Sequence, residues 1–224
     1  MVHPASLENA FVRLESLRAD HADALHAAAR EKPGLYALAP VPVEAAGMRA
    51  YVDRALADAA AGQAVPFAIA RKARGQPSDR IVGCTRFMSL EWWSWPPGAV
   101  QTPGEPRRAD RGDPPDVVEI GHVWLAASSL RTAVNTAACL LMMAHAFDAW
   151  RVHRLTLKTD VRNHRSRAAI ERLGGQFEGV LRSHLPAADG IVRDTAMYSV
   201  LPREWPAIKV RLESALASAQ YGTT

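Results

Sequence analysis

The sequence predicts an α/β fold, a single domain with a mixed central sheet and helices on both faces. Between residues 117 and 182, short β-branched stretches alternate with longer apolar stretches, which is typical of strands connected by crossover helices. Residues 117–125 are mainly apolar at both alternating sets of positions, as in a central strand covered on each side. The 224 residues are enough for one large or two small domains, and a hydrophobic content of 48% permits a sizeable core. We expect one domain over residues 1–224.

One strand and two helices are predicted at the start of the chain. Residues 11–15 alternate between apolar and polar side chains and predict the strand. Asp20 is placed to cap a helix over residues 20–31. The second helix is predicted over residues 43–61, where Gly62 closes it.

A hairpin and a run of alternating elements are predicted next. Residues 65–72 and 81–90 flank a polar turn and predict an antiparallel hairpin, whose second strand should pair with residues 117–125. The remaining predicted elements are a buried helix over residues 133–150, a strand over 154–160, a helix over 163–173, strands over 176–182 and 194–201, and a final helix from residue 205.

The segment of about residues 91–116 is unusually long for a loop in a compact domain. It contains Trp92, Trp93 and Trp95 close together, which is not the composition of a disordered segment. Tryptophan combines a large apolar surface with a polar N–H group. We therefore expect the three side chains to shape a binding pocket or a subunit contact, or to pack as a local lid.

The start of the predicted helix over residues 133–150 has two readings. Helix N-termini present unpaired N–H groups and a positive partial charge, so they bind phosphate readily. Thr132 and Thr136 place hydroxyl groups there, and Arg131 adds a positive charge. The alternative is an ordinary capped core helix, because most helix starts bind nothing.

Charge and composition exclude several classes of protein. The net charge of +4 and the pI of about 9.4 permit attraction to anions, but no basic block marks a nucleic-acid-binding arm. Cys84 and Cys139 lie in apolar runs and are expected to be buried free thiols. No signal peptide or membrane span is indicated, which predicts a cytoplasmic protein. The scattered histidines lack the spacing of metal ligands, so no metal site is expected.

Several short motifs together resemble one known family. They are Glu119-Ile120-Gly121, Thr136, the stretch from Asn163 to Ser166, Leu173-Gly174, residues 177–182 and Glu204-Trp205. This combination resembles the GCN5-related N-acetyltransferase (GNAT) superfamily, and within it the RimJ/RimL-like branch. The resemblance covers most of the chain and implies a single acetyltransferase-like domain, with acetyl-CoA as co-substrate and a long inserted loop at about residues 91–116.

The resemblance implies that one loop holds the pyrophosphate of the coenzyme through backbone N–H groups. The implied contacts are Leu130, Arg131, Thr132, Ala133, Val134, Asn135 and Thr136. Arg131 and Ala133 stand where the family usually has glycine. Backbone donors survive this change if the loop needs no positive φ there, and the Arg131 charge can itself attract phosphate.

The same resemblance implies how the acetyl arm is held. The strand containing Gly121 is expected to part from its parallel neighbour, and the backbone N–H groups of Val123, Trp124 and Leu125 are implied to polarise the thioester carbonyl. Asn163 is well placed to cap a helix and is also implied to contact the coenzyme arm. Ser166 is either a solvated first-turn serine or, by resemblance, the group that protonates the leaving thiolate.

Glu119 is the candidate proton acceptor of the reaction. A carboxylate in a covered strand needs a partner or becomes a base, so Glu119 is either a general base or a structural carboxylate bonded to backbone or arginine. Strict alternation places Glu119 and Gly121 on one face of the strand and His122 on the other. His122 reads as a packed core histidine.

The favoured function is therefore direct transfer of an acetyl group from acetyl-CoA to a primary amine, without an acyl-enzyme. The amine is either a protein N-terminus or a small molecule. The alternatives are a module that holds acetyl-CoA without turnover, and association with RNA through an arginine-rich surface. Nucleic acid is the less favoured partner, no membrane is expected, and a homodimer is possible.

Overall fold

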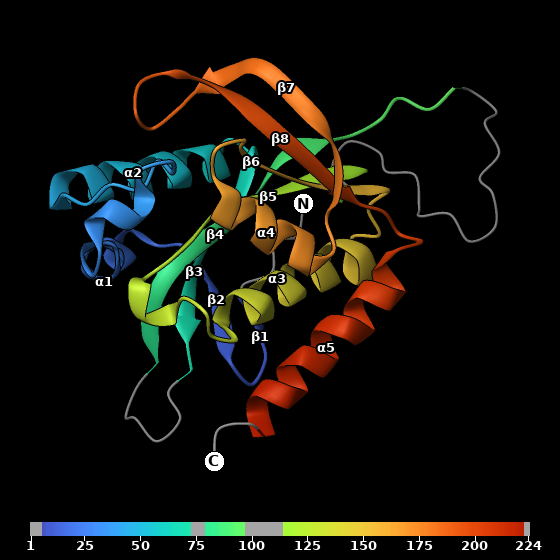
Figure 1. Ribbon diagram of the computed structural model, residues 1–224, viewed down its shortest axis with the longest axis horizontal. Coiled ribbons are helices and arrows are strands. Elements are labelled where there is room, and N and C mark those ends of the chain that lie inside the picture. The colour runs from blue at the N-terminus through green and yellow to red at the C-terminus, as the bar shows by residue number, and fades with distance from the viewer. Residues whose placement is uncertain (1–5, 73–78, 97–113, 222–224) are drawn as a thin grey trace.

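The computed structural model describes residues 6–72, 79–96 and 114–221, which form an open α/β fold (Figure 1). Within the described residues, a single eight-stranded sheet has the order β1-β2-β3-β4-β5-β6-β8-β7, and only β5 and β6 pair in parallel. The strands are β1 (Ser6–Glu8), β2 (Val12–Ser16), β3 (Ala64–Arg71), β4 (Arg80–Glu91), β5 (Val117–Leu125), β6 (Arg154–Asp160), β7 (Gln176–Pro186) and β8 (Val192–Val200).

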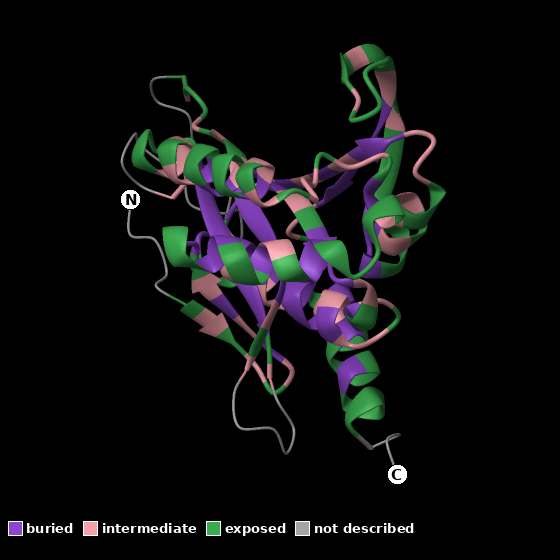
Figure 2. Ribbon diagram, turned by 90° about the vertical axis from the view of Figure 1, so that its left-hand side faces the viewer, coloured by how far each residue is buried: buried purple, intermediate pink, exposed green. Residues whose placement is uncertain are grey.

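Helices cover both faces of this sheet. They are α1 (Ala22–Arg30), α2 (Ala45–Ala60), α3 (Val134–Ala144), α4 (His164–Leu173) and α5 (Trp205–Tyr221). Adjacent residues of β4 point to opposite faces, and Cys84 contacts Tyr51 of α2 at 3.3 Å whereas Thr85 contacts Met142 of α3 at 3.2 Å. The helices α2 and α3 therefore lie on opposite faces. Figure 2 shows the buried strands between the exposed surfaces of the helices.

The predicted fold class is confirmed, and one local expectation is wrong. Strand β8 lies between β6 and β7 and is antiparallel to both, so β6 and β7 run parallel, as crossover helices predict, without being hydrogen-bonded neighbours. Asp20 does not cap α1, because a 3-10 turn over Ala19–His21 precedes the helix and the Arg18 N–H donates to Nδ1 of His21. The Asp20 carboxylate instead accepts a hydrogen bond from the Arg18 guanidinium at 3.1 Å.

A β-bulge in β5 changes which residues share a face. Arg86 pairs with Gly121 and Cys84 pairs with Trp124, so β5 holds one residue more than β4 between these pairs. His122 takes the extra position with a φ of 50°. Its Nδ1 atom lies 3.3 Å from the Tyr51 hydroxyl group, on the α2 side of the sheet. The expectation that His122 faces away from Glu119 and Gly121 is therefore wrong.

The two described ends of the segment between β4 and β5 are held together. The Asp116 N–H donates to the Glu91 carbonyl at 2.9 Å, and the Asp116 carboxylate accepts from the Trp93 N–H at 2.8 Å. The rings of Trp93 and Trp95 both contact the ring of His153, with centroids 5.2 and 5.4 Å away. Of the predicted inserted loop, residues 97–113 lie outside the described residues.

Both cysteines are buried free thiols, as expected. Burial raises the pKa of Cys84 to about 11 and that of Cys139 to about 12, so both thiols stay neutral. Over residues 6–72, 79–96 and 114–221, no helix has both the length and the apolar character needed to cross a membrane.

Candidate active site

The central strands β5 and β6 pair over only three residues before they part. The pairs are Val117 with Arg154, Val118 with Leu155, and Glu119 with Thr156. Beyond Glu119, β5 continues to Leu125 and beyond Thr156 β6 continues to Asp160, but the two strands no longer pair with each other. Backbone groups in the parted region are free to bind a ligand that lies between the strands. The parting of β5 that the sequence resemblance implied is confirmed.

The loop before α3 has the predicted position and an unexpected backbone conformation. The Thr132 hydroxyl donates to the Ser129 carbonyl at 2.7 Å and accepts from the Val134 N–H at 3.3 Å, which closes the turn into the helix. Arg131 is exposed and has a φ of 57°. This left-handed conformation costs a non-glycine residue roughly 1–2 kcal/mol. The glycine typical of the family thus matches the backbone here, and Arg131 occupies the position at a cost.

Replacing Arg131 by glycine tests whether its charge compensates for this cost. We expect roughly tenfold weaker acetyl-CoA binding, equivalent to about 1.4 kcal/mol, because a phosphate-attracting guanidinium is lost. Arg151 offers a matched control, since it is also exposed, has a φ of 57° and follows the other end of the α3 segment. Arg151→Gly should leave the affinity unchanged in titration calorimetry. Equal affinities for the two variants would contradict a coenzyme contact by Arg131.

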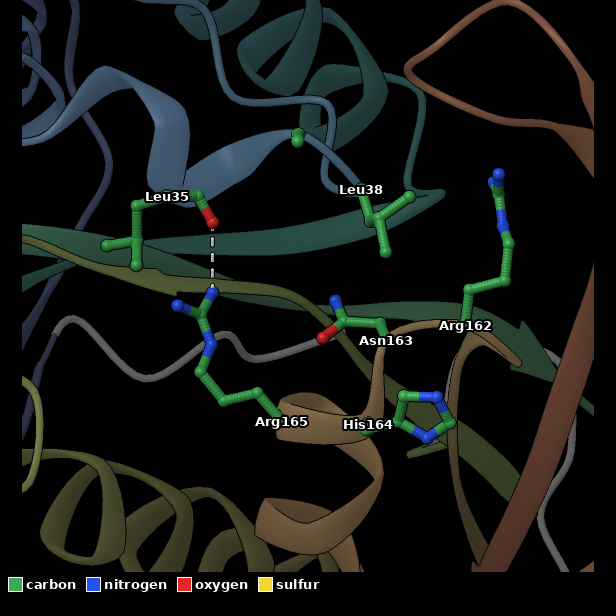
Figure 3. A pocket seen from close by; sticks show the side chains of 7 residues that line it. Leu35, Leu38, Arg162, Asn163, His164 and Arg165 are labelled. Atoms are coloured by element: carbon green, nitrogen blue, oxygen red, sulfur yellow. Dashed lines mark hydrogen bonds between the residues drawn. The ribbon is translucent and has the colours of Figure 1, made fainter.

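A pocket of about 310 Å³ lies between the segment after α1 and the start of α4 (Figure 3). It is lined by Leu35, Ala37, Leu38, Arg162, Asn163, His164 and Arg165. The Arg165 guanidinium donates to the Leu35 carbonyl at 3.1 Å and connects its two sides. Asn163 is the N-cap of α4, because its Oδ1 atom accepts from the Ser166 N–H at 3.1 Å. The capping role predicted for Asn163 is confirmed.

Two substitutions separate capping by Asn163 from ligand binding. Asn163→Ala should lower the free energy of unfolding by about 1 kcal/mol through the lost cap and should also weaken acetyl-CoA binding. Asn163→Ser keeps a good capping side chain but removes the amide, so stability should recover while the affinity stays low. Urea unfolding and calorimetry on the same preparations measure both. If Asn163→Ala binds acetyl-CoA with the parental affinity, Asn163 acts only as a helix cap.

The side chains at the end of β5 are packed inside the protein. The buried Tyr36 hydroxyl donates to the Leu125 carbonyl at 2.9 Å, and the Tyr36 ring meets the Trp124 ring edge to face. Burial raises the pKa of Tyr36 to about 12. Trp124 and Leu125 are 5% exposed, whereas Val123 is 36% exposed. A ligand between the strands would therefore meet the backbone of Trp124 and Leu125 rather than their side chains.

Glu119 is a buried carboxylate with one oxygen atom fixed. Oε2 lies 2.8 Å from Nζ of Lys158 and accepts from the Ser89 hydroxyl at 3.0 Å, while the side chain is 4% exposed. The other oxygen, Oε1, points to Gly121, where an added Cβ atom would lie only 3.1 Å from it. The sequence left open a backbone or arginine partner for Glu119, and the structure provides a lysine and a serine.

A second pocket, of about 340 Å³, opens beside Glu119 at the paired end of β5 and β6. It is lined by Ser89, Glu91, Trp93, Val117, Glu119, Arg154, Thr156, Lys158, Leu181, His184 and Met197. Trp93 is 40% exposed here. This pocket and the pocket at Asn163 lie toward opposite ends of the parted strands. Trp93 thus lines this pocket, while a role of the three tryptophans in a binding pocket, a subunit contact or a local lid stays a prediction.

His122 of β5 and Ser166 of α4 differ in their surroundings. Burial is the main cause that lowers the pKa of His122 to about 4, so the imidazole is neutral at neutral pH. Its contact with Tyr51 agrees with the packing role predicted from the sequence. Ser166 is half-buried in the first turn of α4. Its role as proton donor stays a prediction.

The sequence analysis missed Lys158 and Ser89 as partners of Glu119. Lys158 was visible as a charged residue inside a β-rich stretch, two positions after Thr156 and therefore on the same face. The contact of Lys158 with Glu119 depends on the register between β5 and β6, and sequence periodicity does not predict that register. Ser89 has a φ of 49° in an irregular part of β4, so alternation did not reveal its direction. The described part of the chain holds no cluster of three metal-ligand side chains.

Comparisons with known proteins agree on one family. Residues 12–176 match the family model described as acetyltransferase (GNAT) domain. The chain is 37% identical over 87 residues to the Bacillus subtilis (strain 168) protein named "Putative ribosomal N-acetyltransferase YdaF", a match that spans 39% of this chain and 46% of that protein.

Two solved structures show the same fold over most of the chain. A GCN5-related N-acetyltransferase from Brucella melitensis is 29% identical, with a TM-score of 0.73 over 93% of this chain and 84% of that one. The ribosomal L7/L12 alpha-N-protein acetyltransferase RimL, in complex with coenzyme A, has a TM-score of 0.64 at 17% identity, over 88% of this chain and 97% of that one. The family model covers well over half of the sequence, and the chain therefore belongs to the GNAT acetyltransferase family.

Proposed function

We propose that the chain transfers the acetyl group of acetyl-CoA directly to the α-amine of a protein N-terminus. The observation that carries the proposal is the parting of β5 and β6 immediately beyond a buried, oriented carboxylate, Glu119. The coenzyme reaches this point from the α3 end. The amine reaches it from the pocket lined by Glu119 and Trp93.

The residues divide the chemistry between them. The amine nitrogen attacks the thioester carbonyl, and the backbone N–H groups of Val123, Trp124 and Leu125 stabilise the oxyanion. Glu119 receives the amine proton through water. The tetrahedral intermediate then collapses, the C–S bond breaks, and Ser166 gives its hydroxyl proton to the departing thiolate while it takes up a proton from water. The loop over residues 130–136, together with Asn163, holds the coenzyme.

The choice of a protein amine over a small amine rests on two observations. The acceptor pocket is open to solvent at Trp93, so a long substrate can extend out of it. The Bacillus subtilis relative is named as a ribosomal N-acetyltransferase, and the RimL structure as an alpha-N-protein acetyltransferase. A homodimer stays a prediction, to be tested by light scattering.

An acceptor screen tests this function. Release of coenzyme A thiol from acetyl-CoA is measured with peptides that have free N-termini, the same peptides with blocked N-termini, polyamines and aminoglycosides. We expect thiol release only with the peptides that have free N-termini. Acetyl-CoA should also raise the thermal unfolding midpoint of the protein. Release with polyamines or aminoglycosides alone would identify a small-amine enzyme. Binding of acetyl-CoA without thiol release in the presence of any of these amines would identify a non-catalytic binding module. Salt-dependent binding of RNA would support the RNA alternative.

A further inference from the structure

We propose that Lys158 is the positioning residue of the reaction, which anchors one oxygen of Glu119 and so holds the other toward the site of acetyl transfer. The inference rests on the proposed function, in which Glu119 receives the amine proton. It concerns a residue that neither the motifs nor the sequence analysis assigned.

The contacts of Glu119 divide its two oxygen atoms between two tasks. Lys158 at 2.8 Å and Ser89 at 3.0 Å both hold Oε2. Oε1 faces Gly121, the second residue of β5 beyond the last pair with β6. One oxygen is therefore anchored and the other is directed to where the strands part. A proton acceptor must be held within hydrogen-bond reach of its donor, so this orientation is functional geometry.

Strand register explains why a lysine reaches this position. Thr156 is the last β6 residue to pair with β5, opposite Glu119. Lys158 follows two positions later on the same face, where β5 has already moved away, and its partner on the other side is Met197 of β8. Its side chain is therefore free to cross the gap back to Glu119. It is 21% exposed, which leaves the ion pair largely shielded from water.

Burial makes the ammonium group necessary. A carboxylate that is 4% exposed is disfavoured in its charged form unless an opposite charge lies beside it. Among the described residues, the other charged or titratable groups around Lys158 and Glu119 are Asp58 of α2, Arg86 and Glu91 of β4, His122 of β5, Arg154 of β6, Glu178 and His184 of β7, and Arg193 of β8. Arg154 is already paired with Glu178, and His122 is neutral at neutral pH. Within the described part of the chain, Lys158 is the cation that contacts Glu119.

The test compares Lys158→Met, which removes the charge, with Lys158→Arg, which keeps it. The acceptor is a peptide carrying an N-terminal aminooxy group, which stays uncharged through the neutral range, so that all of it is reactive at the pH of the assay. The parent on an ordinary N-terminal peptide is run in parallel. Lys72→Met is the matched control, since Nζ of Lys72 lies 3.0 Å from Glu8 and its side chain is 29% exposed, away from the site.

We expect kcat to fall roughly tenfold or more in Lys158→Met, because the proton-accepting oxygen of Glu119 is then no longer held toward the site of acetyl transfer. The KM for acetyl-CoA should stay at the parental value. Lys158→Arg should largely restore kcat, and Lys72→Met should not change it. Adding Glu119→Gln to Lys158→Met should lower kcat little further, because both substitutions act on the same proton acceptor.

Two outcomes would overturn the inference. A parental kcat in Lys158→Met, or a loss of kcat that Lys158→Arg does not relieve, would assign Lys158 to structure alone. The thermal midpoint with and without acetyl-CoA shows whether the variant is folded and binds the coenzyme. If the parent itself releases no thiol with the peptide, the proposed function fails instead, and the two failures are distinguishable.

Discussion

Glu119→Gln should lower kcat by about 10²-fold or more near neutral pH, while the Kd for acetyl-CoA stays at the parental value. Glutamine keeps the shape of the side chain and can still accept hydrogen bonds from Lys158 and Ser89, but it cannot take up a proton. The loss should narrow as the pH rises, because solvent then becomes a better proton acceptor. Single-turnover kinetics across pH, with calorimetry for the coenzyme, measures both quantities.

A nearby carboxylate provides the control for this result. Glu178 of β7 is ion-paired with Arg154 and accepts from the Ser199 hydroxyl at 2.8 Å, yet it does not line the acceptor pocket. Glu178→Gln should therefore change stability slightly and leave the pH–rate profile in place. If Glu119→Gln behaves in the same way, Glu119 is a structural residue and solvent accepts the proton.

Gly83→Ala should be among the most damaging single substitutions in the sheet. A Cβ atom at Gly83 would overlap the Trp124 carbonyl oxygen and lie 3.0 Å from the Leu125 Cα atom, and these backbone atoms have no flexible route away. We expect a loss of roughly 3 kcal/mol in the free energy of unfolding, from forced separation of β4 and β5. Urea unfolding measures this loss.

The same substitution should also impair catalysis in the molecules that remain folded. Displacing the backbone of Trp124 and Leu125 moves the proposed oxyanion donors, so kcat should fall more than the affinity for acetyl-CoA. Gly34→Ala is the matched control, because no atom lies within 4 Å of its added Cβ. It should change stability by less than about 0.5 kcal/mol. Equal stabilities for the two variants would show that β4 and β5 can separate without cost.

Periodicity and turn residues were sufficient to predict most elements. The hairpin of β3 and β4, the pairing of β4 with β5, and α2 with its closing Gly62 all follow from local pattern, and the structure confirms them. The placement of β8 between β6 and β7 does not follow, because it depends on which strand packs best against a distant neighbour. The prediction that Asp20 caps α1 was wrong for a local reason, because the Arg18 guanidinium binds the Asp20 carboxylate.

The candidate site was predictable in sequence position but not in geometry. Asn163 was assigned correctly as a helix cap because capping depends on neighbours within one turn. The face of His122 was assigned wrongly because one bulged residue reverses alternation. From the sequence, backbone donation by the loop depended on whether residue 131 needs a positive φ. The structure shows that Arg131 has a positive φ. The contact between Lys158 and Glu119 could not be predicted without knowing where β5 and β6 stop pairing.

The closed base of the segment between β4 and β5 has a consequence for how such enzymes diverge. Because Asp116 ties Glu91, Trp93 and His153 together, the two strands are already joined before the intervening residues begin. Doubling the length of a loop whose ends are fixed costs only about 0.6 kcal/mol. Insertions can therefore accumulate beside the proposed acceptor pocket without disturbing the pairing of β4 with β5.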